Sequence, residues 1–383
     1  MKKIVLINQS AHYLTIDIVN EFAKRYDYIV LIYGYLDTSS RKIDSSVDKI
    51  KIISFNRKSI ISRFFTWAIA TVQIYFLLII KYRKYEILFF TNPPLSYLSA
   101  SFIKLNFSIM IFDIYPDNLK NFGIKENHFI YKWWAKQNQK IFPRSKAIFT
   151  LSKGMSSCLT KYVSKEKIHI VPIWNDDVYF KPIAKEQNVF LKKYNIGEKF
   201  IILYSGNIGF THNVETIIEL AKELSNFPDI VFLIIGDGGK KATLQKRVLE
   251  YQLNNCVFLD WQPSNMVSYS FSCGDIGIVT INEDTSLLSV PSKTFNLMAT
   301  GTPLLCIAPQ DSELNFLIEK HNNGVCYNKN QLSKMKEFIL EIKNNPEQRK
   351  RMQQNSLLAA KSYTSQNAKL VYYYLNNQLA DDV

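Results

Sequence analysis

The sequence contains few acidic side chains, and its cysteines are not closely spaced. Its 33 Asp and Glu residues are outnumbered by 47 Lys and Arg residues, so the formal net charge is +14. This basic excess indicates an anionic partner, such as a nucleic acid, an anionic membrane surface or a phosphorylated substrate. The five cysteines are scattered and form no C-x-x-C motif. That pattern argues against a zinc site or a disulfide framework and favours a reducing compartment.

Several nucleotide-binding motifs are also missing. No G-x-G-x-x-G follows the first expected strand, and no G-x-x-x-x-G-K-[ST] occurs anywhere. A dinucleotide-dependent oxidoreductase and a P-loop NTPase therefore lose their main support. No basic block is long enough for a nucleic-acid-binding tail, and we expect no nucleic-acid partner. The first ten residues, MKKIVLINQS, have too few apolar side chains for a signal peptide, and we expect a first strand there.

Short β-rich runs alternate with helical patterns along most of the chain. This alternation predicts an α/β fold with parallel sheets and helices on both faces. A chain of 383 residues is long for a single domain, which favours two. The expected strands cover residues 3–8, 27–33, 49–55, 85–92, 107–115, 146–152 and 168–173 in the first half, and 200–206, 229–236, 256–261, 275–281, 303–309 and 324–327 in the second.

The alternation lapses into polar, helix-poor sequence around residues 175–199. We therefore predict two tandem Rossmann-like, doubly wound domains, covering residues 1–185 and 186–360. The last segment, residues 361–383, continues a helical pattern that contains no strand, so we expect it to form a C-terminal helix.

One apolar run has more than one interpretation. Residues 64–80 are mostly apolar and have basic residues on both sides, within residues 58–84. The run is shorter than the roughly 20 residues of a usual membrane span, and it contains Gln73. The sequence favours a helix that covers the sheet. A basic-flanked helix lying in a membrane interface is the second interpretation, and a true span is the third.

Loops that follow strands in the second half carry the residues suited to a ligand. In open parallel sheets, ligands bind outside the carboxyl ends of the strands. Gly206 and Gly209 follow the first strand of this half and permit close approach of the backbone to a ligand. The segment IGDGGKK follows the second strand at residues 235–241, and Trp261 and Gln262 follow the third. An aromatic ring and an amide at that place suit a nucleotide base.

A fourth segment joins a helical pattern to a following strand. It reads SVPSKTFNLMATGTPLLCIAP over residues 289–309. Pro291 suits the first position of a helix, where the backbone N–H groups of Ser292 and Lys293 have no intrahelical partner and create a pocket for an anion. Gly301 suits the end of that helix. The alternative is an ordinary helix start with a solvated lysine.

Four segments of the second half occur in an order typical of one enzyme family: SGNIG (205–209), IGDG (235–238), LDWQP (259–263) and VPSKTFNLMATGTPLL (290–305). With them the chain resembles the retaining GT-B glycosyltransferases of glycosyltransferase family 4, and most of all the bacterial members that build surface polysaccharides on lipid carriers. TNPPLSYLSA and FDIYPD in the first half extend the resemblance to nearly the whole chain.

The resemblance implies two domains that face a central cleft, with the C-terminal helix crossing back to the first domain. It implies a nucleotide-sugar donor, with UDP as the expected nucleotide, and a lipid-linked or saccharide acceptor bound by the first domain. It further implies retention of anomeric configuration, no metal or other cofactor, and a cytoplasmic enzyme peripheral to the inner face of the cytoplasmic membrane. The expected donor-binding residues are Gly206, Asn207, His212, Asp237, Gly238, Gly239, Trp261, Gln262, Ser292, Lys293 and Asn296.

The chain departs from the family pattern at the charged positions. The family has two glutamates with seven residues between them, and the matching positions here are Leu288 and Asn296. A basic pair that is common after the first strand of the donor domain is replaced by Asn207 and His212. We expect Lys293 to compensate for the missing cations by binding the diphosphate.

The candidate residues for the acceptor hydroxyl lie in the first half. Asp113 and Asp117 belong to a segment that directly follows a strand. One interpretation is that they cap the next helix, and the other is that one of them takes the acceptor's proton. We expect Asp113 to have that role, with Asp117 and His12 as alternatives. A sugar-nucleotide epimerase on the same scaffold and an inactive nucleotide-binding partner subunit remain as alternative functions.

Overall fold

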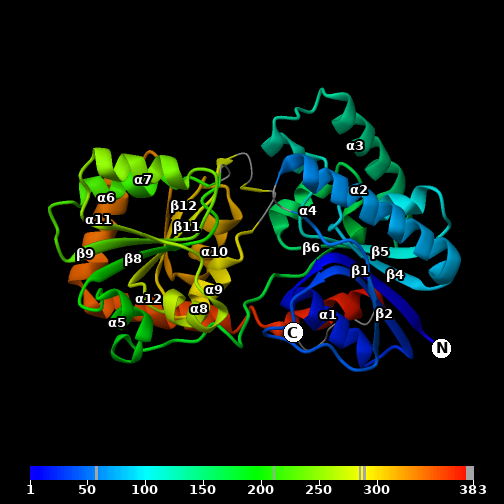
Figure 1. The fold of residues 1–383 in the computed structure, drawn as a ribbon, viewed down its shortest axis with the longest axis horizontal. Coiled ribbons are helices and arrows are strands. Elements are labelled where there is room, and N and C mark those ends of the chain that lie inside the picture. Colours follow the sequence, from blue (N-terminus) through cyan, green and yellow to red (C-terminus); the bar gives the residue numbers. More distant parts are fainter. Residues whose placement is uncertain (57–58, 210–211, 284–285, 288–289, 377–383) are drawn as a thin grey trace. The chain divides into compact units, whose positions relative to one another are not determined.

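The computed structural model describes residues 1–56, 59–209, 212–283, 286–287 and 290–376. Its contacts divide the chain into unit 1, Met1–Ile173 with Ser365–Val383, and unit 2, Trp174–Thr364 (Figure 1). The sequence analysis predicts a second domain at residues 186–360. Unit 2 begins before that range, at Trp174, and ends after it, at Thr364. Asn175 shows why the first boundary lies near 174: its backbone N–H and its side-chain amide both donate to the carbonyl of Tyr363, at 3.1 and 2.9 Å. The two ends of unit 2 are therefore tied together.

Unit 1 contains a seven-stranded parallel sheet in the order β3-β2-β1-β4-β5-β6-β7. Its strands are β1 (Lys3–Ala11), β2 (Tyr28–Leu36), β3 (Val47–Lys51), β4 (Glu86–Phe90), β5 (Asn106–Ile111), β6 (Ile148–Thr150) and β7 (Ile168–Ile170). The α-helices are α1 (Tyr13–Ala23), α2 (Ile60–Leu77), α3 (Phe129–Ile141), α4 (Lys153–Leu159) and α13 (Ala368–Leu375), with shorter helices η1 (Leu78–Tyr82), η2 (Ser96–Ser101) and η3 (Asp117–Phe122).

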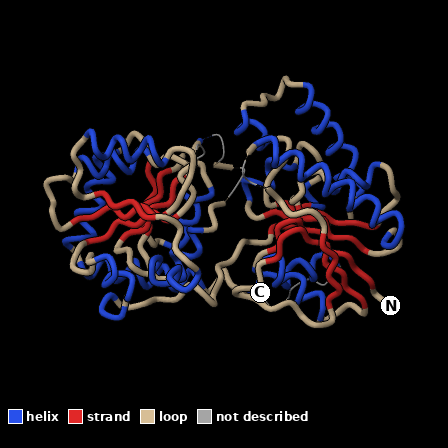
Figure 2. The backbone as a smooth tube through the Cα atoms, viewed as in Figure 1, coloured by secondary structure: helices blue, strands red, loops and turns tan. Residues whose placement is uncertain are grey.

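Unit 2 contains a six-stranded parallel sheet in the order β10-β9-β8-β11-β12-β13. Its strands are β8 (Phe200–Ser205), β9 (Ile230–Ile235), β10 (Cys256–Leu259), β11 (Ile276–Thr280), β12 (Leu304–Ile307) and β13 (Gly324–Tyr327). Its helices are α5 (Val189–Tyr194), α6 (Glu215–Glu223), α7 (Lys241–Glu250), α8 (Ser264–Phe271), α9 (Lys293–Ala299), α10 (Glu313–His321), α11 (Leu332–Asn344) and α12 (Pro346–Ala360). Figure 2 shows both sheets in the middle of their units, between helices.

This architecture confirms the predicted fold of two doubly wound α/β domains. Every strand expected from the sequence has a counterpart, although several end earlier. The run 107–115, for example, contains β5, which stops at Ile111. The reason is a turn that begins at Phe112, whose backbone N–H donates to the Thr91 side-chain hydroxyl instead of to a neighbouring strand.

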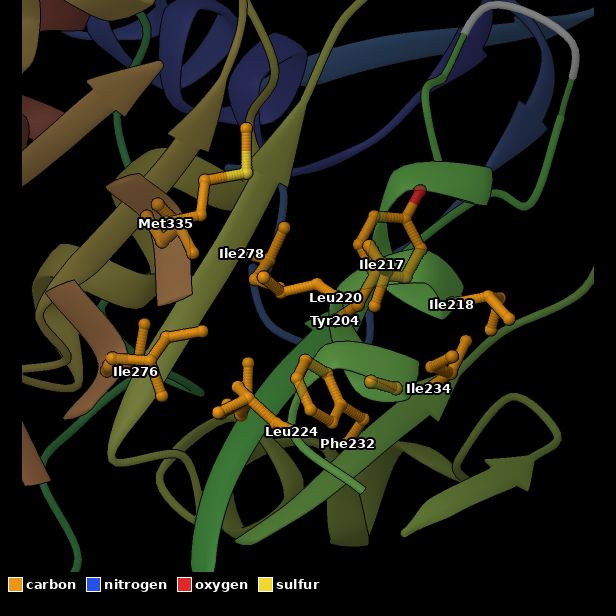
Figure 3. Packing of buried hydrophobic residues seen from close by; sticks show 14 of the residues in the cluster. Tyr204, Ile217, Ile218, Leu220, Leu224, Phe232, Ile234, Ile276, Ile278 and Met335 are labelled. Atoms are coloured by element: carbon orange, nitrogen blue, oxygen red, sulfur yellow. The ribbon is translucent and has the colours of Figure 1, made fainter. Parts of the chain in front are cut away.

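The core of unit 2 explains how its sheet is held. Alternate residues of β8 and β9, such as Tyr204 and Phe232, point to one face of the sheet and pack against Leu220 of α6 and Met335 of α11 (Figure 3). All four are fully buried. Full burial of side chains of this size contributes about 1.5–3 kcal/mol each, so the carboxyl ends of these strands are rigidly placed.

The C-terminal helix α13 belongs to unit 1, as predicted. The Tyr372 ring lies edge-on to Phe22 of α1 at 5.8 Å between centroids, and the Arg25 guanidinium lies 4.6 Å from the centre of the same ring. The chain therefore leaves unit 1, builds all of unit 2 and returns.

Helix α2 covers one face of the unit 1 sheet, as the first interpretation of the apolar run predicts. It begins with a capping box in which Ser59 and Ser62 bond each other's backbone N–H groups. Trp67, Ile74 and Leu78 of α2 and η1 are buried. By length and composition the segment Ile61–Tyr82 is also apolar enough to cross a membrane, yet only 28% of it is buried. Such a segment has a second apolar face that the sheet does not cover.

Candidate functional site

Lys293 lies in a tight pocket at the carboxyl end of the unit 2 sheet. It is the first residue of α9 and is 9% exposed, and among the described residues its Nζ has no hydrogen-bond partner. The Nζ atom lies 4.0 Å from the centre of the Tyr204 ring, where the ring face attracts a cation. A Cβ at Gly206 would lie 2.8 Å from Nζ. A side chain at position 206 would therefore have to displace the Lys293 ammonium group.

Burial controls the charge of this pocket. It lowers the pKa of Lys293 to about 7, because an ammonium group that leaves water without an anionic partner loses its hydration. Burial, followed by the charges of Lys293 and Lys240, lowers the pKa of His212 to about 3. His212 is therefore neutral at physiological pH, and the pocket favours an anionic ligand that would restore the full charge of Lys293.

Two loops meet beside Lys293 because glycines allow their backbones to touch. Gly236 and Gly238 have φ values of 145° and 156°, which side chains rarely tolerate. A Cβ at Gly236 would lie 2.0 Å from the carbonyl oxygen of Gly206, and one at Gly238 would lie 2.4 Å from the carbonyl carbon of Ile208. The loops are also joined by the Ile208 N–H, which donates to the Asp237 carbonyl at 2.8 Å.

Lys240 lies near the same pocket, but its ammonium group is already bonded to other residues. Its Nζ donates to the Glu215 carboxylate at 2.7 Å and to the His212 carbonyl at 2.5 Å. An ammonium group with these partners is already compensated. Of these two lysines, Lys293 is thus the one with bonding capacity to spare.

The helix after Pro291 begins later than the sequence predicts. Helix α9 starts at Lys293 and has 7 residues, and Ser292, its N-cap, is exposed and makes no side-chain cap bond. Pro291 instead belongs to the preceding turn, where its carbonyl accepts from Thr294 at 3.0 Å. So short a helix adds little to anion binding, and the Lys293 ammonium is the main electrostatic feature.

Asn296 lies on the same face of α9 as Lys293. Residues three apart on a helix are neighbours, and the Asn296 Oδ1 atom is buried without a partner among the described residues. An acceptor in this position suits a hydroxyl of a bound sugar or ribose. Leu288, which occupies the other position where the family has a glutamate, lies outside the described residues.

The remaining donor-site candidates line the edges of the loops. Asn207 is exposed, and its carbonyl accepts from the Tyr204 hydroxyl at 2.7 Å. Asp237 and Gly239 are exposed, and the Asp237 carboxylate accepts from the Gly238 N–H at 2.8 Å. Neither side chain bonds to the Lys293 Nζ, which has no hydrogen-bond partner among the described residues.

Trp261 and Gln262 follow β10, two strands from β8 in the sheet. The Trp261 side chain is 56% exposed, so its ring is accessible for stacking. The Gln262 side-chain nitrogen donates to the Asp260 carbonyl at 2.9 Å. The amide oxygen of Gln262, Oε1, is buried without a hydrogen-bond partner among the described residues. This pair has the chemistry for a base, at some distance from the lysine.

Tyr204 was missed by sequence reasoning. The sequence predicts a buried strand at this position, and nothing in a strand pattern distinguishes a core tyrosine from one that supports a charged group. Its position two residues before Gly206 was the available signal, because alternate residues of a strand point to one face of the sheet.

In unit 1 the structure separates the roles of the two aspartates. Asp117 is buried and accepts from the hydroxyls of Tyr131 and Tyr162, each at 2.8 Å, and pairs with Lys161. These three partners join η3 to α3 and to the segment after α4. A carboxylate so fully bonded has a structural role.

Asp113 has fewer partners. It follows β5, its backbone N–H faces the Thr91 hydroxyl at 3.4 Å, and its carboxylate accepts from the Asn118 amide at 2.9 Å. Burial raises the pKa of Asp113, and the Asn118 bond opposes that shift only in part. The carboxylate is thus a stronger base than that of an ordinary aspartate. It lies at the carboxyl end of the parallel strands, where ligands bind.

His12 directly follows β1 at the same edge of the sheet. Its Nε2 lies 3.0 Å from the Ser10 hydroxyl, and its Nδ1 lies 3.7 Å from the Asp37 carboxylate. Since β4 separates β1 from β5, neighbouring strand spacing puts His12 roughly 10 Å from the Asp113 strand. His12 and Asp113 are therefore two separate candidates along one edge.

Within the described residues, no group of three or more His, Cys, Asp or Glu side chains is arranged to hold a metal ion.

The arrangement of two parallel-sheet α/β units matches the GT-B fold of proteins of known structure. Sucrose-phosphate synthase from Thermosynechococcus elongatus superimposes with a TM-score of 0.75 at 15% identity, covering 99% of both chains. HepE from Anabaena in complex with UDP superimposes with a TM-score of 0.71 at 10% identity, covering 98% of this chain and 100% of that one. At these identities the likeness shows the fold.

Sequence comparison finds a family match within the second unit. Residues 186–358 match the family described as "Glycosyl transferases group 1". The chain is also 30% identical over 175 residues to the "Putative colanic acid biosynthesis glycosyl transferase WcaI" of Escherichia coli K12, a match that covers 45% of this chain and 43% of that protein. The chain spans 43% and 60% of the lengths of the curated relatives it matches.

Proposed function

We propose that the protein is a glycosyltransferase that moves a sugar from a UDP-linked donor to a lipid-linked or saccharide acceptor in surface polysaccharide biosynthesis. The observation that carries this proposal is the buried, unpartnered ammonium of Lys293 among glycines. The group 1 family match, the name of the Escherichia coli relative and the UDP in HepE support the donor class. We place the reaction at the inner face of the cytoplasmic membrane, with retention of configuration and without a metal.

The Lys293 ammonium would act on the leaving group. When the bond between the sugar and the diphosphate breaks, negative charge develops on the diphosphate, and Lys293 would donate a hydrogen bond to one of its oxygens. A pre-positioned donor in a site that excludes water stabilises such charge without reorganisation. The Asn296 carbonyl oxygen would orient a donor hydroxyl, and the Trp261 ring would stack on the base.

Donor binding should stabilise the protein against heat. A ligand present at about one hundred times its dissociation constant adds roughly 2.7 kcal/mol to the free energy of unfolding. We expect millimolar UDP to raise the melting temperature measured by differential scanning fluorimetry, and GDP and ADP to raise it less. A melting temperature that none of the three nucleotides changes would contradict the donor site.

The reaction itself is tested with a panel of UDP-sugars and membrane-extracted lipid acceptors. A glycosylated acceptor and released UDP support the proposal. An epimerised sugar nucleotide without transfer would identify an epimerase, and UDP binding without either product would identify an inactive partner subunit.

The affinity for a UDP-sugar should fall as the pH rises. Lys293 is protonated in about half of the free molecules at pH 7, because its pKa is about 7, and the bound diphosphate requires the charged form. Below pH 6 the lysine is already charged, so affinity is nearly constant. Above pH 7 each pH unit should weaken binding by up to about tenfold, since a proton must be taken up.

Calorimetry checks this prediction between pH 6 and 9, with a UDP-sugar as the ligand because its diphosphate diester does not titrate there. Repeating the titration at pH 7 in buffers with different ionisation enthalpies should show uptake of about half a proton. Lys293→Met should remove the slope. A slope that persists in this variant would assign the titration to another group.

A further inference from the structure

Helix α2 exposes a continuous apolar stripe along its whole length. We call this the outer stripe of α2; it consists of Ile61, Phe65, Ala68, Val72 and Phe76 of α2 and continues with Ile79 and Ile80 of η1. Ile61, Phe65 and Ile80 are 82%, 64% and 73% exposed. The five members in α2 are spaced three or four residues apart, which places them on one face of the helix. Helix α2 has 18 residues and is therefore about 27 Å long.

The opposite face of α2 is apolar too. Trp67, Ala70, Ile74 and Leu78 follow the same spacing and are buried in unit 1. The Trp67 ring stacks on Phe55 at 5.6 Å and meets Tyr115 edge-on at 5.8 Å. A helix with two opposite apolar faces usually has both covered, whereas here only the inner face is covered.

Aromatic and basic side chains continue the outer stripe at its C-terminal end. Phe102, which follows η2, is 79% exposed, and its ring lies 6.2 Å from that of Tyr75 of α2. Beside it is a surface cavity of about 510 Å³ lined by Arg83, Lys84, Lys104, Leu105 and Asn106. We call this the basic pocket. Its three basic residues make no ion pair within the described part of the chain.

The charge around the stripe selects its partner. No Asp or Glu occurs between Asp48 and Glu86, while the same stretch contains eight Lys and Arg residues. A second copy of this face would bring like charges together, which opposes self-association. Anionic phospholipid supplies both an apolar phase for the stripe and phosphates for the basic pocket.

We propose that the outer stripe of α2 and the basic pocket dock unit 1 on an anionic phospholipid bilayer. The helix lies in the plane of the interface, with the stripe at the acyl boundary and a lipid phosphate in the basic pocket. A span is excluded by the inner face, because crossing the bilayer would pull Trp67 and Ile74 away from unit 1. This docking would place the proposed sugar transfer at a membrane surface. The observations that support it all concern unit 1, so it does not depend on the donor site of unit 2.

Flotation with vesicles tests the docking, in the absence of any donor. The full chain should float with phosphatidylglycerol–phosphatidylcholine vesicles at low salt, float less with pure phosphatidylcholine, and be released by high salt because screening weakens attraction to the headgroups. Equal binding to both vesicle types would overturn the role of the basic pocket. Release by detergent alone would show a span and overturn the interfacial position.

Matched variants locate the contact. Phe76→Asp/Ile80→Asp should reduce flotation at least tenfold, whereas Leu249→Asp/Leu358→Asp, at exposed leucines of unit 2, should leave it unchanged. Arg83→Glu/Lys84→Glu should reduce it by at least about tenfold, because each basic residue near the surface contributes a factor of roughly five. Lys350→Glu/Arg351→Glu, which changes the charge equally on α12, should not.

The rise in melting temperature caused by UDP distinguishes a failure of membrane docking from a failure of the proposed donor site. It reports on unit 2, so the stripe variants should retain it while losing flotation. Stripe variants that float like the wild type would overturn the proposal. A wild-type dimer in size-exclusion chromatography that Phe76→Asp/Ile80→Asp converts to a monomer would also overturn it and assign the stripe to a second copy of the chain.

Discussion

Lys293→Ala is expected to weaken UDP binding by roughly 10- to 100-fold, since a hydrogen bond to a charged group contributes about 1.5–3 kcal/mol. The Nζ atom has no hydrogen-bond partner among the described residues, so the loss of hydrogen bonding should appear in donor binding and not in folding. Lys293→Met, which removes the buried amine but keeps an apolar side chain of similar length, should even raise the melting temperature without donor. Calorimetry with UDP and a thermal scan without it measure the two effects.

Lys240→Ala is the matched control for this variant. Its ammonium is bound to Glu215 and to the His212 carbonyl, so its removal should lower stability and change UDP affinity less than Lys293→Ala does. Equal losses of affinity would show that the diphosphate lies between the two lysines. A loss of stability in Lys293→Met would show that the ammonium supports the fold.

Asp113→Asn is expected to reduce turnover by about 10²- to 10⁴-fold, the usual contribution of a positioned general base. The amide keeps the shape of the side chain but cannot take the acceptor's proton. UDP binding should stay unchanged, because Asp113 belongs to unit 1 and Lys293 to unit 2. Single-turnover transfer assays measure the rate, and calorimetry measures the binding.

Asp117→Asn distinguishes this role from a structural one. Asp117 joins Tyr131, Tyr162 and Lys161, so its loss should lower the melting temperature. If Asp113→Asn lowers stability as Asp117→Asn does and keeps near-normal turnover, Asp113 is structural. The His12 imidazole would then be the next candidate for the base.

The acid limb of the pH–rate profile gives an independent view of Asp113. Burial raises the pKa of its carboxyl above the ordinary value, so the active, ionised form should appear at a higher pH than for an exposed aspartate. The wild-type rate should accordingly fall on acidification from a higher pH than usual, and this limb should vanish in Asp113→Asn.

The sequence predicted the strands and the order of the loops because both depend on local patterns. Buried parallel strands read as apolar runs, and glycines such as Gly236 and Gly238 mark backbone turns that few other residues adopt. The segment after Pro291 indicated an anion site near Lys293, and the resemblance implied that the anion is a diphosphate. The start of α9 was predicted incorrectly, because Pro291 suits a turn as well as the first position of a helix.

What the sequence did not provide depends on contacts between distant residues. The Tyr204 ring under Lys293, the bonds that occupy Lys240 and the three partners of Asp117 each join segments far apart in the chain. The apolar run of α2 shows the same limit. Its composition allowed three interpretations, and only the burial of Trp67 and the exposure of Phe65 show that one side covers the sheet while the other faces outward.

The return of α13 to unit 1 has a consequence for biosynthesis. Domains fold as units while the ribosome is still extending the chain, and unit 2 is one unbroken stretch from Trp174 to Thr364. It can complete its sheet during translation, whereas Phe22 of α1 and Tyr26, which follows this helix, lack their contact with Tyr372 until α13 is made. The half of the protein that the ribosome makes first is therefore finished last.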